Sequence, residues 1–299
     1  MTAPADPPPA EPGRGDAAPP ATGPGDASPV ATGPGDASPV ATGPGGTRPT
    51  GPEEVVTALT EVSAFGPYFA VATGPREEPG WRPLAGLAAD EAGLREWIAG
   101  HGRRLGTGES RVAASILYQG LAARLWSPVV GVAAAYGLVP AAAGSELRWR
   151  PAATGPLPLW SPPSARWPAV PDARERAAAV YRAVMTEVLT PLAEAVGRLT
   201  GVAPALLRGN ASAALAAVLK TVPAPLAGRA GALVGDVLPL GELDGTGGLA
   251  EPAPGAYFFV RRSCCLYYRV PGGGLCEDCA LLPREQRELI WARATGTAR

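Results

Sequence analysis

All four cysteines of this 299-residue chain lie near its C-terminus, at Cys264, Cys265, Cys276 and Cys279. Their spacing is C-C-x10-C-x2-C, and no cysteine occurs elsewhere in the chain. A soft metal or a cluster needs thiolates that converge on one point, whereas cysteines without a shared role are scattered through a core. The spacing therefore predicts a single shell of four sulfur ligands.

Three other uses of four thiols compete with a cluster. Disulfides are typical of oxidising compartments and small domains, whereas this chain is long, 46% hydrophobic and opens with no signal sequence. Structural zinc favours C-x2-4-C pairs, which Cys276 and Cys279 match and Cys264 and Cys265 do not, and it stays as an alternative. A thioredoxin-like pair needs a βαβ unit, which is not visible around Cys276, and it would leave the first two cysteines unexplained.

An iron–sulfur cluster with two irons tolerates uneven spacing because two metals share its four thiolates. Neighbouring side chains on a regular strand point to opposite faces, so the chain must bend at Cys264-Cys265 for both to reach one cluster. Residues 266–270 then predict a short aromatic-rich strand, and Pro271-Gly272-Gly273-Gly274 predicts a turn that returns the chain to Cys276. Pro283 predicts the start of a terminal helix.

The motif C-C-x10-C-x2-C near a C-terminus resembles the ferric siderophore reductase family, the FhuF-like proteins with a [2Fe-2S] cluster. Upstream, residues 111–140, the following residues 147–150, and residues 209–215 are also similar to members of that family. The resemblance implies a cytoplasmic one-electron reductase that frees iron from ferric chelates. It further implies a ferric siderophore or another ferric chelate as the substrate.

Charge and hydropathy argue against two classes of partner. The chain has 26 basic and 27 acidic residues and thus lacks the basic surface that nucleic acid or an anionic membrane requires. Residues 125–145 are uncharged and long enough to span a bilayer, but they are mostly Ala, Gly and Val and contain Pro128 and Pro140. They predict a buried core helix rather than a membrane span.

Composition divides the chain into three parts. Residues 1–50 form a Pro-, Gly- and Ala-rich tail in which the decamer at 21–30 recurs at 31–40, and with so little to bury we expect it to be disordered. Residues 51–250 predict a helical domain, and residues 251–299 predict the cysteine-bound module. The expected fold class is mainly α with a few short strands.

Start and stop signals predict the elements of the helical domain. Helices are expected from Pro52 to Val62, from Asp90 or Glu91 to Ala99 with a stop at Gly100, over residues 109–124, and from Asp172 to Leu199 with a kink at Pro191. A short strand is expected at 68–73, and a hairpin or irregular strands at 147–150 and 157–160.

A few polar residues upstream of the cysteines are candidates for function. His101, the sole histidine, follows an expected helix end and needs no function there. Ser115 and Arg124 are expected to bond to their own helix. Asn210 is placed to cap a helix; the alternative is that Asn210, Ser212 and the free amides of that helix end meet a ligand or the cluster.

Three arginines flank the thiolates, and the electrons must come from a separate donor. The charge of Arg261, Arg262 and Arg269 would raise the cluster potential or attract an anionic chelate, unless these side chains are simply solvated. Residues 245–250 satisfy G-x-G-x-x-A, but Glu251-Pro252 follows instead of a helix, so we interpret them as a loop and not a dinucleotide site. No other nucleotide or flavin signature stands out.

The sequence thus predicts a [2Fe-2S] protein that acts as a ferric siderophore reductase. Two alternatives stay open: a [2Fe-2S] electron carrier or redox sensor with a protein client, and a structural zinc module on a binding protein.

Overall fold

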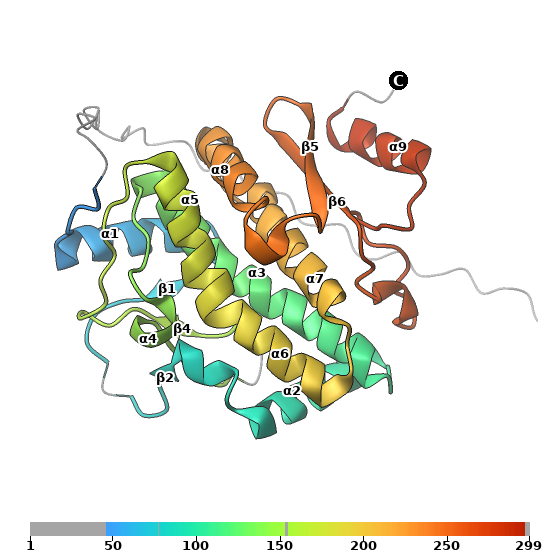
Figure 1. Ribbon diagram of the computed structural model, residues 1–299, viewed down its shortest axis with the longest axis horizontal. Helices are drawn as coiled ribbons and strands as arrows, with labels where there is room; N and C mark the ends of the chain where they lie inside the picture. Colours follow the sequence, from blue (N-terminus) through green and yellow to red (C-terminus); the bar gives the residue numbers. More distant parts are fainter. Residues whose placement is uncertain (1–45, 77, 153–154, 297–299) are drawn as a thin grey trace, which may run out of the picture. The chain divides into compact units, whose positions relative to one another are not determined.

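The structure is a computed structural model that describes residues 46–76, 78–152 and 155–296. The helices are α1 Pro52–Ser63, α2 Glu91–Leu105, α3 Ser110–Tyr136, α4 Ala143–Glu146, α5 Ala173–Tyr181, α6 Thr190–Thr200, α7 Pro204–Ala217, α8 Ala224–Val237 and α9 Arg284–Ala294. The strands are β1 Val71–Ala72, β2 Arg82–Pro83, β3 Arg148–Trp149, β4 Leu159–Trp160, β5 Gly247–Ala253 and β6 Ala256–Arg261. The expected mainly α fold with a few short strands is confirmed (Figure 1).

Most of the expected N-terminal tail, residues 1–45, lies outside the described residues. The folded part of the chain already includes Arg48, which forms an antiparallel bridge with Ala169. Nearby, the Thr50 hydroxyl donates to the carbonyl of Trp167 at 2.7 Å. These contacts fix the approach to α1, whose first turn carries Pro52 as expected.

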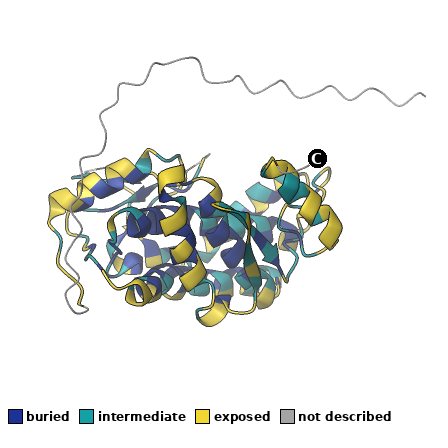
Figure 2. Ribbon diagram, turned by 90° about the horizontal axis from the view of Figure 1, so that it is seen from above, coloured by how far each residue is buried: buried dark blue, intermediate teal, exposed yellow. Residues whose placement is uncertain are grey.

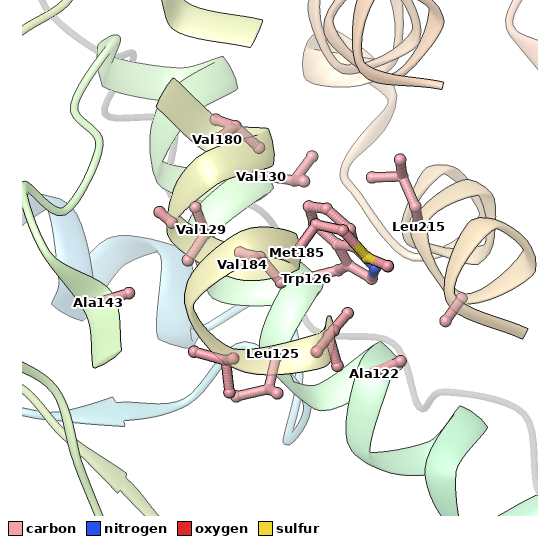
Figure 3. Packing of buried hydrophobic residues seen from close by; sticks show 14 of the residues in the cluster. Ala122, Leu125, Trp126, Val129, Val130, Ala143, Val180, Val184, Met185 and Leu215 are labelled. Carbon is pink, nitrogen blue, oxygen red and sulfur yellow. The ribbon is translucent and has the colours of Figure 1, made fainter. Parts of the chain in front are cut away.

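Helix α3 lies at the centre of the helical domain and contacts α1, α2, α6, α7 and α8. Its residues from Leu125 to Ala134 are all buried, because a helix that is apolar on every side is stable only when other elements surround it. Figure 3 shows Trp126 and Val130 of this helix packed against Met185 and Leu215. The core helix expected at 125–145 is therefore confirmed as far as Tyr136; Gly137 (φ 71°) ends α3, and residues 138–142 are not helical. No helix in the described part of the chain is long and apolar enough to cross a membrane.

The long helical segment after Asp172 is continuous, although proline interrupts its hydrogen bonding. Asp172 caps α5 by accepting the amide of Glu175 at 2.9 Å, as expected for its start. Residues 182–189 are π-helical and lead directly into α6, where Pro191 is in the first turn. The π-helical segment lies directly before Pro191, which cannot donate a backbone hydrogen bond, and the expected kink at Pro191 stays a prediction.

A small sheet with strand order β1-β4-β3-β2 closes one side of the helical domain. β3 and β4 pair antiparallel, which confirms the expected hairpin, whereas the expected strand at 68–73 is reduced to β1. Arg124 of α3 is 2% exposed and donates to the carbonyls of Tyr68, Ala70 and Leu157. The expectation that Arg124 bonds to its own helix is therefore wrong, because its guanidinium reaches across to the residues that precede β1 and β4.

Helix α2 is longer than expected. It runs past Gly100 and ends at Gly106, which adopts the left-handed conformation (φ 66°) that favours glycine at a helix end. Consequently His101 lies within the helix, where its ring is 3.2 Å from the Arg104 guanidinium and burial lowers its pKa. Gly102, in the added turn, permits close packing on α3. A Cβ at this position would meet the Thr107 carbonyl at 3.0 Å and Ala113 Cβ at 3.4 Å.

The hairpin β5–β6 leads into the cysteine segment. Residues 247–250 are part of β5, so the expectation of a loop at 245–250 is wrong, although the segment is still no phosphate-binding turn between a strand and a helix. Both strands contact α7, and the ring of Phe258 in β6 lies 5.4 Å from that of Trp291 in α9. Figure 2 shows that α9 is covered far less than the helices around α3.

Candidate metal centre

The first cysteine pair follows β6 through a tight change of direction. The chain bends at Arg262 and Ser263, and Leu266 has a left-handed backbone (φ 67°), which is unfavourable by about 1–2 kcal/mol for a residue with a side chain. This turn directs the amide of Leu266 to Cys264 Sγ, at 3.3 Å. The predicted bend is confirmed in this neighbourhood, with the turning residues on either side of the two cysteines.

The predicted strand at 266–270 is wrong. Residues 267–269 form one 3₁₀ turn, because the left-handed Leu266 redirects the backbone before a strand can start. Gly272 (φ 74°) and Gly274 (φ 70°) then take up left-handed conformations, as expected of a glycine turn that brings the chain back.

The second cysteine pair lies on a turn of its own. The amide of Cys279 donates to the carbonyl of Cys276 at 3.0 Å, and the amide of Leu281 donates to Cys279 Sγ at 3.4 Å. Helix α9 begins at Arg284, directly after Pro283, which agrees with the predicted start of the terminal helix to one residue. Cys265 and Cys279 are buried, whereas Cys264 and Cys276 are half-buried at the edge of the site.

Two sulfur atoms already have the separation of ligands to one metal. Cys265 Sγ lies 3.6 Å from Cys276 Sγ, and two thiolates at about 2.3 Å from a tetrahedral metal would be about 3.8 Å apart. The Cys276 thiol shares its proton with Cys265, which lowers the pKa of Cys265 and raises that of Cys276. The two halves of the motif therefore come into contact through Cys265 of the first pair and Cys276 of the second pair.

The other two sulfurs belong to the same neighbourhood. Burial raises the pKa of the Cys264 thiol; the Leu266 amide opposes this rise, and the charges of Cys265 and Cys279 add to it. Within the described ranges, no three His, Cys, Asp or Glu side chains are arranged to hold a single metal ion. Of the four thiols, Cys265 and Cys276 have sulfur atoms in contact. Such a set suits a cluster of two irons, because the two metals share four thiolates. The four thiols and the approach of Cys265 to Cys276 thus fit a [2Fe-2S] cluster, and the full set of four ligands stays a prediction.

Asn210 and Ser115 support the cysteine segment from the helical domain. The expectation that Asn210 caps a helix is wrong, because α7 begins at Pro204 and Asn210 is in its middle, completely buried. Its amide Nδ2 donates to the carbonyl and the Oγ of Ser115, at 2.8 and 2.9 Å. Ser115 was expected to bond to its own helix, but its Oγ donates to the carbonyl of Cys265 at 2.6 Å.

Of the other polar candidates, only Arg261 is buried beside the thiols. Ser212 bonds with Thr246 at 2.6 Å and thereby holds the residues before β5 rather than the cysteines. Arg262 is exposed and donates to the carbonyl of Gly245 at 3.2 Å. Arg269 is exposed and pairs with Glu109 at 3.0 Å.

Gly209 and Ser263 are a contact that sequence reasoning missed. A Cβ at Gly209 would overlap Ser263 Oγ, so glycine permits the close approach of α7 to the residue before Cys264. The only signal was the glycine itself, which precedes Asn210 and was interpreted as the opening of a helix.

Comparison with known proteins agrees with this geometry. Residues 261–281, which include all four cysteines, match the family model described as FhuF 2Fe-2S C-terminal domain. The resemblance is thereby confirmed for this segment, and the match indicates a [2Fe-2S] cluster as its cofactor. It does not extend to residues 111–150 or 209–215, whose likeness to the family stays a prediction. No curated protein matches the chain significantly.

Proposed function

We propose that this chain, whose residues 261–281 are a [2Fe-2S] domain of the FhuF type, is a cytoplasmic ferric siderophore reductase with Cys264, Cys265, Cys276 and Cys279 as its cluster ligands. The observation that supports it most strongly is the approach of Cys265 Sγ to Cys276 Sγ, at 3.6 Å, within the matched segment. In this proposal residues 51–250 form the domain that the chelate meets. The cluster module then starts with the hairpin β5–β6, since residue 250 falls within β5.

The protein residues prepare the site for a change of charge. When bound, the cluster supplies a one-electron couple. The amides of Leu266 and Leu281 donate to Cys264 Sγ and Cys279 Sγ, which places one N–H donor at each of these two sulfurs. Burial of Cys265 keeps water from one side, whereas the half-buried Cys264 leaves the other side open to an acceptor. Iron would then leave the chelate because oxygen-donor ligands hold the softer ferrous ion more weakly.

A hollow next to the cysteine segment is the proposed place for the chelate. It has a volume of about 420 Å³, within the usual range of small-molecule sites, and lies between α2, the start of α3 and the end of α6. Its lining includes Arg103, which has no carboxylate partner among the residues described, and Glu109, which pairs with Arg269 of the cysteine segment. A larger hollow of about 640 Å³ near Trp97 also has Arg103 in its lining, but within the described part of the chain its lining residues form no hydrogen bond or ion pair with the cysteine segment.

The electrons are proposed to come from a separate donor protein or reductant. Residues 247–250 are part of an antiparallel strand and cannot form the turn between a strand and a helix on which a dinucleotide phosphate rests.

Anaerobic purification, metal and sulfide analysis, visible absorption and paramagnetic resonance test the cofactor. We expect equal amounts of iron and acid-labile sulfide, and Cys276→Ser and Cys279→Ser should lose iron and colour together. Arg262→Gln, in the same segment and exposed, is the matched control and should keep both. Zinc in place of iron would overturn the proposal.

Titration of the chemically reduced protein with ferric siderophores tests the reaction. We expect the cluster to be reoxidised as ferrous iron appears, which a ferrous-specific chelator traps. The Arg103→Ala variant should need a higher siderophore concentration to reach the same rate of cluster reoxidation. A reduced cluster that persists in the presence of every ferric chelate would instead favour an electron carrier with a protein client.

A further inference from the structure

Arg261 is a buried cation that forms no ion pair with a carboxylate in the described part of the chain. Its side chain ends strand β6 and is only 3% exposed. Nη2 donates to Asn210 Oδ1, whereas Nε and Nη1 are buried and have no hydrogen-bond partner. The main-chain carbonyl of Asp278, in the same segment, accepts the Arg261 amide at 3.2 Å, and the Asp278 carboxylate lies in the field of the guanidinium without forming an ion pair with it.

Such an arrangement is unfavourable by itself. A guanidinium stays charged inside a protein, and burying a charge without a partner costs several kcal/mol. Unpaired buried N–H groups add to that cost. The unpaired Nε and Nη1 of Arg261 can therefore face a further negative charge beside that of the Asp278 carboxylate.

Asn210 holds the guanidinium in place and is itself fixed. Because Nδ2 of Asn210 donates to both oxygens of Ser115, its Oδ1 is the atom that faces Arg261. Ser115 in turn donates to the carbonyl of Cys265. The cation and the first cysteine pair are thus connected by two side chains, Asn210 from α7 and Ser115 from α3.

The thiols lie within the field of this cation. Arg261 lies three residues before Cys264, and a chain of hydrogen bonds through Asn210 and Ser115 connects its guanidinium to the carbonyl of Cys265. Two irons, their sulfides and four thiolates together carry a net negative charge, and an added electron makes it more negative. A fixed positive charge stabilises the reduced form more than the oxidised form.

We infer that Arg261 is the counter-charge of the cluster, held by Asn210 and Ser115 as positioning residues, and that it raises the reduction potential. This inference rests on the proposed set of four cysteine ligands. It separates Arg261 from Arg262 and Arg269, whose exposed side chains are screened by water or paired with Glu109.

Redox titration of the purified holoprotein, followed by visible absorption and paramagnetic resonance, tests this inference. Arg261→Gln should lower the equilibrium constant for one-electron reduction by about tenfold or more, which is a shift of about 59 mV to more negative potential. Arg261→Lys, which keeps the charge, should recover most of the shift. Arg262→Gln, the matched control, should change the constant by less than about threefold.

Asn210→Asp gives a second variant that leaves Arg261 in place. A carboxylate at this position would pair with the guanidinium and should move the potential in the same direction as Arg261→Gln. If the Arg261→Gln variant binds no cluster, the inference is tested by comparing the reduction potentials of the Asn210→Asp and Arg262→Gln variants. The inference is overturned if Arg261→Gln or Asn210→Asp keeps its full iron content and an unchanged reduction potential; the proposed cofactor then still stands. Wild-type protein without iron would overturn the proposed function instead.

Discussion

Ser115 Oγ, in the core helix α3, donates a hydrogen bond of 2.6 Å to the main-chain carbonyl of Cys265, which lies 150 residues further along the chain. Ser115 is completely buried, and the packing around α3 fixes its position. The first cysteine pair is therefore held by the helical domain as well as by its own hairpin. The two proposed parts of the chain, 51–250 and 251–299, thus share polar contacts at the cysteines.

Ser115→Ala should weaken the metal centre more than the fold. The carbonyl of Cys265 would lose its donor, and a buried group left without a partner costs about 1–3 kcal/mol. We expect a lower urea midpoint and faster transfer of iron to an external chelator. Ser127→Ala is the control, because this nearby α3 hydroxyl donates only to Ala123 of its own helix, at 2.7 Å. Equal iron-release rates in the two variants would show that the Ser115 bond does not support the site.

Arg124→Met should destabilise the small sheet. The guanidinium donates to three main-chain carbonyls, and burial lowers its pKa to about 10, so it is charged at neutral pH. Methionine fills a similar volume but leaves the three carbonyls without a donor, which should cost about 3 kcal/mol or more in unfolding free energy. Chemical denaturation measures this loss. Arg111→Met, at an exposed position of the same helix, should change stability by no more than about 0.5 kcal/mol.

The sequence predicted those features that depend on local geometry. The glycine turn after Pro271, the helix starts at Pro52 and after Asp172, and the terminal helix after Pro283 all follow from the preferences of single residues, and all are present. The cysteine spacing indicated the [2Fe-2S] segment because thiols so close in sequence have few other common uses.

Features that depend on contacts between distant segments were not predictable. Gly209-Asn210 has the appearance of a helix start, but Pro204 opens α7 six residues before Asn210. Both residues serve tertiary contacts instead, Gly209 with Ser263 and Asn210 with Arg261. The aromatic residues Tyr267 and Tyr268 favour a strand, yet the left-handed Leu266 places them in a turn. In each case a long-range contact or a constrained backbone overrides local propensity.

Tyr118 should make the fold sensitive to alkaline pH. Its buried hydroxyl donates to the carbonyl of Leu189 at 3.2 Å, and burial raises its pKa above the ordinary value. The unfolded chain ionises near about pH 10, so the stability from this group is present below that pH and is lost as the pH rises further. Tyr118→Phe should lower the unfolding free energy by about 0.5–1.5 kcal/mol at neutral pH. The difference from wild type should then shrink above pH of about 10.

Urea titrations at a series of pH values measure that difference. Because the raised pKa of Tyr136, about 12, affects both proteins alike, subtraction isolates Tyr118. A difference that stays constant up to pH of about 11 would contradict the assignment.

Gly209→Ala should disturb the cysteine segment, and Ser263→Ala should restore it. The new methyl group would overlap Ser263 Oγ, a buried hydroxyl without a hydrogen-bond partner in the residues described, and this overpacking should cost about 1–3 kcal/mol. Ser263→Ala alone should be neutral or slightly stabilising, and in the double variant the two methyl carbons would lie 3.4 Å apart, a tight but tolerable contact. We therefore expect an interaction energy of about 0.5–3 kcal/mol in a double-mutant cycle. Gly228→Ala, at an open position of α8, is the control and should stabilise the protein by about 0.5–1 kcal/mol. Strict additivity of the two substitutions would show that α7 does not press on the residue before Cys264.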